Sequence, residues 1–176
     1  MDGQLIVPQG SLLVLAGNSG CGKSTLAERL FESHQIVSAD FFRGLLCGDE
    51  GDQTVTGQAW SLANQLIQER LLLGQTTVVD SVALQPRDRV SLVKMAQRAN
   101  TSAALLMLWA STQDCLDGQL TRARQVPEAA VLKMAERAEH TRGLLLSGGL
   151  IAEGFQRVHL IDRSTANSLI FNQPND

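Results

Sequence analysis

Short apolar runs alternate with amphipathic segments along most of this 176-residue chain. The run SLLVLA at 11–16 is short and ends at Gly17, which is typical of a buried strand. Similar runs predict further strands at 36–38, 76–80, 102–109 and 157–161. Strands that alternate with helices indicate parallel β-α-β units, in which helices cover both faces of the sheet.

The segments between the apolar runs have helical spacing and recognisable ends. Proline is favoured in the first turn of a helix, so Pro86 and Pro127 are each expected to begin one. Gly74 is expected to close the helix that contains Trp60. Helices are predicted at about 23–34, 60–74, 86–100, 112–120 and 127–147.

The phosphate-binding loop is the strongest motif in the chain. GNSGCGKST at 17–25 matches the pattern G-x-x-x-x-G-K-[ST] and stands between an apolar run and an amphipathic helix. Glycines let the backbone curl so that its N–H groups point at phosphate oxygens, and the following helix adds the positive end of its dipole. The predicted nucleotide contacts are Gly17, Asn18, Ser19, Gly20, Cys21, Gly22, Lys23, Ser24 and Thr25.

This loop turns the strand and helix pattern into a specific fold prediction. The sequence predicts the three-layer α/β/α fold of P-loop NTPases and kinases, with about five parallel strands and a helical lid. We expect residues 1–164 to form one P-loop kinase domain and residues 121–146 to form its lid. Residues 165–176 are expected to be a flexible C-terminal tail.

Composition indicates which partners and which cellular compartment to expect for such a domain. With 44% apolar residues the chain can bury a core, and its net charge of −3 argues against binding nucleic acid through overall charge. Cys21, Cys47 and Cys115 are widely spaced, which favours free thiols in a reducing compartment. No signal peptide and no membrane-spanning run is apparent, so we expect a cytoplasmic protein without a membrane partner.

Metal and transfer chemistry are assigned to residues at the carboxyl ends of the strands, where ligands bind in open α/β sheets. Lys23 is expected to reach the β- and γ-phosphates of ATP, and the Ser24 hydroxyl to bind Mg²⁺. Asp80 ends the strand at 76–80 and is a second candidate for organising Mg²⁺, although a turn-forming role before Ser81 is the alternative.

The stretch SADFFRG at 38–44 places Asp40 just past the second strand, near the expected nucleotide. A P-loop kinase needs a group that orients an acceptor hydroxyl and takes its proton, and an aspartate suits that role. Arg43 would lie one helical turn further on, where its planar fork suits a phosphate on the acceptor. The alternative is that Asp40 caps a short helix and Arg43 is solvated.

Several blocks together resemble one family. GNSGCGKST, SADFFRGLLCGDEGDQTVTG, VVD, RQV and EGF occur in this order and are similar to the kinase domain of bacterial polynucleotide kinase–phosphatase. That P-loop kinase family is related to phage polynucleotide kinase, and the likeness covers roughly residues 10–162. It implies transfer of the ATP γ-phosphate to a 5′-hydroxyl end of RNA or DNA in nucleic-acid repair. If phosphatase or ligase activities are needed, we expect separate chains to supply them. Asp40 matches the general base, and Arg43 matches the arginine that holds the adjacent 3′-phosphate.

The predicted lid carries Arg122 and Arg124 in TRARQVPE, just before a proline-started helix. An arginine there suits the negative charge that develops on the transferring phosphoryl group, whereas a solvent-facing basic turn is the alternative. By resemblance, Arg124 in RQV aligns best with the family.

Two positions depart from the family pattern. Gly118 stands where the family tends to have an arginine, and Ala83 stands where it often has an asparagine. These departures keep two further functions open, namely a small-molecule kinase and an ATP-binding switch or subunit whose transfer activity has decayed.

Overall fold

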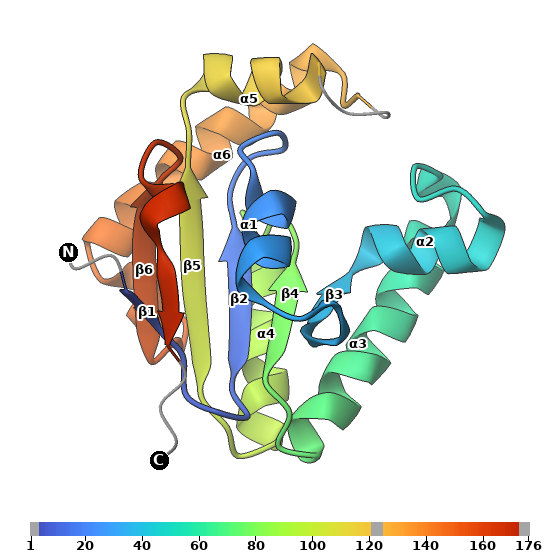
Figure 1. The fold of residues 1–176 in the computed structure, drawn as a ribbon, viewed down its shortest axis with the longest axis vertical. Coiled ribbons are helices and arrows are strands. Elements are labelled where there is room, and N and C mark those ends of the chain that lie inside the picture. The colour runs from blue at the N-terminus through green and yellow to red at the C-terminus, as the bar shows by residue number, and fades with distance from the viewer. Residues whose placement is uncertain (1–3, 121–124, 173–176) are drawn as a thin grey trace.

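The central sheet has five parallel strands in the order β3-β4-β2-β5-β6 (Figure 1). The computed structural model describes residues 4–120 and 125–172. The strands of this sheet are β2 (Leu12–Ala16), β3 (Ile36–Ser38), β4 (Thr77–Asp80), β5 (Ala103–Trp109) and β6 (Arg157–Asp162). Each of the five predicted strands is therefore present, and the predicted P-loop kinase-type α/β fold is confirmed.

Helices flank the sheet. Figure 1 shows α1 in front of it, α4 and α6 behind it, α5 above β5, and α2 and α3 beyond the β3 edge. The helices are α1 (Lys23–Leu30), α2 (Ala39–Cys47), α3 (Thr56–Leu72), α4 (Pro86–Arg98), α5 (Thr112–Leu120), α6 (Glu128–Leu146) and α7 (Gly149–Ala152). Short 3-10 turns are η1 (Ser33–Gln35), η2 (Gln53–Val55) and η3 (Ala166–Ser168). Within the described residues, no helix has the length and hydropathy needed to cross a membrane.

Side chains along β2 point alternately to the two faces of the sheet, and this explains why every residue of the strand is apolar. Leu12, Val14 and Ala16 face the core that is closed by α3, α4 and α6. Leu13 and Leu15 face the opposite core, which α1 and α5 help to close. Because both faces of the strand are buried, every position must be apolar, as in other parallel sheets.

Helix ends differ from the predicted ones where local backbone geometry intervenes. The helix expected at about 23–34 ends at Leu30, because Phe31 adopts an extended conformation, and η1 follows it. The helix expected at 60–74 begins earlier, at Thr56, directly after η2.

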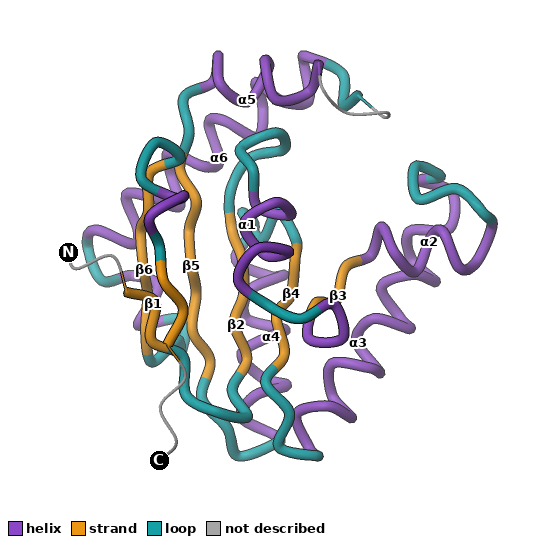
Figure 2. Tube along the Cα trace, viewed as in Figure 1, coloured by secondary structure: helices purple, strands orange, loops and turns teal. Residues whose placement is uncertain are grey.

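A second sheet replaces much of the expected flexible tail. β1 (Gln4–Ile6) pairs in parallel with β7 (Ile170–Asn172), and η3 precedes β7. In the view of Figure 2 this pair of strands overlaps β6. Arg29 of α1 donates to the Ala166 carbonyl at 2.6 Å and to the Leu169 carbonyl at 3.1 Å. Residues 173–176 of the expected tail lie outside the described residues.

Arg29→Ala tests whether these bonds hold the C-terminal segment in place. Two hydrogen bonds from a partly exposed guanidinium should stabilise the folded chain by about 1–2 kcal/mol. We expect faster hydrogen exchange across 166–172 and a modest loss of stability in urea. Arg98→Ala, which removes an exposed arginine from α4, is the control. Equal protection of 166–172 in both variants would contradict this role.

Candidate functional site

Three neighbouring strands bring the predicted site residues to one edge of the sheet. Asp80 at the end of β4 is in register with Leu15 of β2 and with Ser38 of β3. The phosphate-binding loop, Asp80 and Asp40 therefore follow the carboxyl ends of adjacent strands. Strands lie about 5 Å apart, so β3 ends about 10 Å from β2, with β4 between them.

Backbone geometry makes glycine necessary in the phosphate-binding loop. Gly17, Gly20 and Gly22 have φ angles of 145°, 84° and 105°, which side-chain-bearing residues rarely adopt. A Cβ atom at Gly17 would also lie 2.4 Å from the carbonyl oxygen of Leu108 in β5. The loop leads directly into α1, whose first turn contains no acidic residue that would offset the positive end of its dipole.

Lys23 lies within the curl of this loop. Its side chain belongs to a residue that is 8% exposed, and its Nζ donates to the backbone oxygen of Asn18 at 2.7 Å. Nζ also lies 3.6 Å from the sulfur of Cys21. A largely buried ammonium at the N-terminus of a helix is a suitable place for an anionic phosphate. Ser24 follows it on the first turn of α1.

Helix α5 packs directly on the phosphate-binding loop, and this contact explains Gly118. A Cβ atom at position 118 would lie 2.2 Å from the Gly20 carbonyl oxygen. Gln119 donates to the Ser19 hydroxyl at 3.1 Å. The departure from the family pattern at Gly118 therefore has a packing reason, because an arginine there would displace the loop.

Helix α6 also contacts this loop. Asn18 donates from its amide nitrogen to the carbonyl oxygen of Val131 at 3.1 Å. The same asparagine is 4% exposed, and its amide oxygen has no partner among the described residues. The predicted lid segment thus meets the loop through α6, while Arg122 and Arg124 lie outside the described residues.

A buried thiol fills the contact between α5 and the loop. Cys115 is fully buried, and burial together with the neighbouring Cys21 thiol raises the pKa of Cys115 to about 11. At neutral pH this thiol stays protonated and acts as a small apolar side chain.

A buried ion pair, which sequence reasoning missed, supports the segment after β4. Arg89 of α4 is fully buried and pairs with Glu153 through Nε at 2.7 Å and Nη2 at 2.6 Å. Its Nη1 donates to the Ala83 carbonyl oxygen at 3.1 Å. Ala83 has a φ angle of 44°, which is unusual for alanine, and the preceding Val82 accepts a hydrogen bond from the Gly17 N–H at 3.0 Å.

These bonds connect the Asp80 segment to the phosphate-binding loop on one side and to α7 on the other. Glu153 is the first residue of the EGF block at 153–155, and its carboxylate pairs with Arg89. Arg89 looked like one of several polar residues on a predicted amphipathic helix, and only its partner 64 positions away makes it a core residue. Ser81 has a buried hydroxyl without a partner among the described residues.

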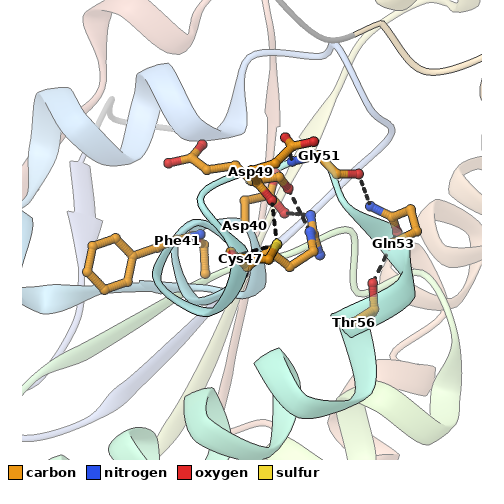
Figure 3. Close-up of polar contacts among 10 residues, drawn as sticks. Asp40, Phe41, Cys47, Asp49, Gly51, Gln53 and Thr56 are labelled. Atoms are coloured by element: carbon orange, nitrogen blue, oxygen red, sulfur yellow. Dashed lines mark hydrogen bonds and ion pairs between the residues drawn. The ribbon is translucent and has the colours of Figure 1, made fainter.

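The stretch after β3 forms α2, and Asp40 lies in its first turn (Figure 3). Ser38 caps this helix by accepting the Phe41 N–H at 3.2 Å. Arg43 is 4% exposed, donates from Nε to the Glu50 carbonyl oxygen at 2.6 Å, and pairs through Nη2 with Asp40. The Asp40 side chain remains 49% exposed. The alternative of a capping Asp40 and a solvated Arg43 is therefore wrong, because Ser38 is the cap and Arg43 is buried.

The acidic loop after α2 is built to hold the Glu50 carbonyl in this place. Asp49 accepts the Gly51 N–H at 2.7 Å, and Cys47 donates from its sulfur to the Arg43 carbonyl oxygen at 3.2 Å (Figure 3). Hydrogen bonds from Thr54 lower the pKa of Asp52. Among the described residues, no group of three or more His, Cys, Asp or Glu side chains is placed to hold a metal ion.

Comparison with known proteins identifies the family. The model of one family, AAA_33, described as an AAA domain, matches residues 12–141. Among curated proteins, the aliphatic sulfonates import ATP-binding protein SsuB of Pectobacterium atrosepticum is 30% identical over 113 residues. That match covers 60% of this chain and 40% of SsuB, so the chain spans less than half the length of that relative.

Solved structures with the same fold come from several functional classes. A gluconokinase of Sinorhizobium meliloti is 19% identical, with a TM-score of 0.58 and coverage of 92% of this chain and 90% of the other. A chain of the PezAT toxin-antitoxin system of Streptococcus pneumoniae is 16% identical, with a TM-score of 0.67 and coverage of 93% and 71%. A chain of a Pnkp1/Rnl/Hen1 complex is 18% identical, with a TM-score of 0.55 and coverage of 69% and 42%. At these identities the likeness shows the fold alone.

Gly118→Ala tests the contact between α5 and the phosphate-binding loop. The added methyl group would meet a backbone oxygen, so α5 or the loop must move, and we expect ATP to bind at least about tenfold more weakly. Calorimetric titration with ATP measures this. Gly143→Ala on α6 is the matched control, since a Cβ atom there meets nothing within 4 Å. Equal ATP affinity in the two variants would contradict the contact.

Arg89→Met tests the buried ion pair. Removing one partner leaves the Glu153 carboxylate largely buried without a counter-charge, which should cost about 3–5 kcal/mol of unfolding free energy. Urea denaturation measures the loss, and the double variant Arg89→Met with Glu153→Met should recover most of it. Arg87→Met is the control, because that side chain is 78% exposed. A single variant as stable as the control would contradict the role of Arg89.

Proposed function

Because this chain belongs to the AAA domain family, and because it has a P-loop kinase-type fold, we propose that it is a polynucleotide 5′-hydroxyl kinase that depends on ATP and Mg²⁺. The observation that carries the proposal is the Asp40–Arg43 pair, which follows β3 at the same sheet edge as the phosphate-binding loop. A repair role, and partner chains that supply phosphatase or ligase activity, belong to the same proposal.

Asp40 is proposed to take the proton from the acceptor hydroxyl. Its carboxylate is half-exposed, so an acceptor can reach it, while its pairing with Arg43 fixes its direction. The pairing oxygen, Oδ1, leaves Oδ2 for the hydroxyl. A carboxylate in this position orients the nucleophile toward a phosphate held at the loop.

Arg43 has a positioning role in this proposal. The resemblance implies that it reads a 3′-phosphate, and that role stays a prediction. In the described structure its Nε and Nη2 are already used by Glu50 and Asp40. A guanidinium that is buried on these partners is suited to hold the Asp40 carboxylate in place.

The residues of the loop and of β4 suit ATP and Mg²⁺. ATP supplies the γ-phosphoryl group, and Mg²⁺ neutralises charge on the phosphates during its transfer. Lys23 and the backbone N–H groups of the glycine loop would hold the phosphates. Ser24 and Asp80 would hold Mg²⁺ together with phosphate oxygens, which suits a metal that binds few protein side chains. Arg122 or Arg124 is proposed to act on the γ-phosphate.

A second candidate function is a kinase for a small molecule such as a sugar acid or a nucleoside. It is favoured by the extent of the fold match to a gluconokinase, because that match spans 90% of the gluconokinase chain. An ATP-binding switch without transfer activity is a third candidate. The packing role of Gly118 weakens this third candidate, because that departure no longer implies decayed chemistry.

Asp40→Asn tests the proposed base. The change keeps the size of the side chain but removes its basicity, so we expect transfer to fall by about 10²- to 10⁴-fold with ATP affinity unchanged. Transfer of labelled phosphate from ATP to 5′-hydroxyl RNA and DNA oligonucleotides measures activity, and calorimetry measures ATP binding.

Asp88→Asn provides the matched control, because the Asp88 side chain is 50% exposed, like that of Asp40, and pairs with the exposed Arg87 on α4, away from α2. Normal transfer in Asp40→Asn would remove Asp40 from the role of base. Failure of the unaltered protein to label any oligonucleotide, with labelling of a sugar acid or nucleoside, would favour the second candidate.

A further inference from the structure

Phe41 is an exposed aromatic side chain directly beside Asp40. It is 53% exposed, and among the aromatic residues that the structure describes it alone belongs to the exposed class. Leaving a phenylalanine in water forfeits about 1.5–3 kcal/mol of burial free energy, although single exposed apolar residues are common. What distinguishes Phe41 from other exposed apolar residues is its place next to Asp40 and its contact with Phe42.

The helix places Phe41 and Arg43 on different sides of Asp40. Each residue advances an α-helix by about 100°, so Phe41 lies about 100° to one side of Asp40 and Arg43 about 60° to the other. Figure 3 shows the Phe41 ring projecting away from the loop that carries Asp49 and Gly51. The exposed carboxylate of Asp40 is thus flanked by a buried guanidinium on one side and an open ring on the other.

The ring is held in one orientation before anything binds. Phe42 is buried, and its ring meets the Phe41 ring at 5.5 Å between centroids with an interplanar angle of 81°. An edge-to-face contact of this kind uses one ring's edge and leaves a face of the exposed ring open. The Phe41 N–H is fixed as well, by its bond to the Ser38 hydroxyl.

We propose that Phe41 is the stacking platform for the nucleobase of the acceptor's 5′-terminal nucleotide. This inference rests on the proposed function and adds the contact that selects a nucleotide over a sugar acid. With a net charge of −3, the chain has little overall electrostatic attraction for a polynucleotide. Base stacking on an aromatic ring supplies affinity without charge and tolerates any base, as an end-processing enzyme requires.

The test compares two acceptors that differ only in the base that would stack. One oligonucleotide carries a normal 5′-terminal nucleotide with a 5′-hydroxyl, and the other carries an abasic tetrahydrofuran residue there with the same hydroxyl. For the normal acceptor, Phe41→Ala should raise KM by roughly 5- to 100-fold and change kcat little. For the unaltered protein, KM should be higher by a similar factor for the abasic acceptor than for the normal one. For Phe41→Ala, KM should be the same for both acceptors.

Two further variants separate stacking from a general surface effect. Leu45→Ala removes a side chain of α2 that is 66% exposed but has no ring, and it should leave KM unchanged. Phe41→Trp keeps a flat ring and should restore discrimination against the abasic end. All variants should be folded at the assay temperature. Phe41→Ala should melt only slightly lower, because it loses its contact with Phe42, and Leu45→Ala should melt like the unaltered protein.

Three results would overturn the inference. An equal KM for Phe41→Ala and Leu45→Ala would show that the ring has no special role, and continued discrimination against the abasic end by Phe41→Ala would show that the base stacks elsewhere. In both cases the kinase proposal stands. Absence of transfer to either oligonucleotide by the unaltered protein overturns the kinase proposal and this inference together.

Discussion

The site depends first on how closely the backbone of the phosphate-binding loop approaches its neighbours. A side chain at Gly17 would collide with the Leu108 carbonyl of β5, and one at Gly20 would collide with the Cys115 carbonyl of α5 at 2.2 Å. The approach is reciprocal, since a side chain at Gly118 would collide with Gly20. β5 and α5 therefore fix the curl of the loop without a ligand. A loop that is already curled loses little conformational freedom when a phosphate binds, so more of the interaction energy appears as affinity.

Helix α6 links this loop to the segment after β4. Near its beginning, Val131 accepts the Asn18 amide at 3.1 Å, and further along, the Thr141 hydroxyl lies 3.4 Å from both the Leu84 carbonyl and Arg89. Arg89 in turn holds Ala83 and pairs with Glu153. Replacing both partners by apolar residues is expected to cost little. We therefore infer that the ion pair serves to fix one arrangement of the segment that begins at Asp80. The residues proposed for Mg²⁺ and for the phosphates therefore share one rigid support.

The sequence predicts the parts of this architecture that depend on local pattern. The five strands of the central sheet, the loop at 17–25 and the helix starts near Pro86 and Pro127 all follow from periodicity and from glycine and proline chemistry. Contacts between distant residues were beyond that kind of reasoning. The β1–β7 sheet joins the two ends of the chain, and the Arg29 bond to Ala166 spans 137 positions. Burial of Arg43 was missed because arginine is normally exposed, and only the Glu50 carbonyl explains it.

In the proposed function the acceptor is selected at α2, because proteins with different names share the fold of the rest of the domain. A gluconokinase, a toxin-antitoxin chain and a chain of the Pnkp1 complex all share this fold, so the fold cannot decide the acceptor. The segment after β3 can decide it, since β4 separates β3 from β2, which leads into the phosphate-binding loop. Here it offers a carboxylate that is held by a buried arginine, and next to it a braced aromatic ring. A hydroxyl attached to a flat base would satisfy both features at once, whereas a hydroxyl on a small acid would leave the ring unused.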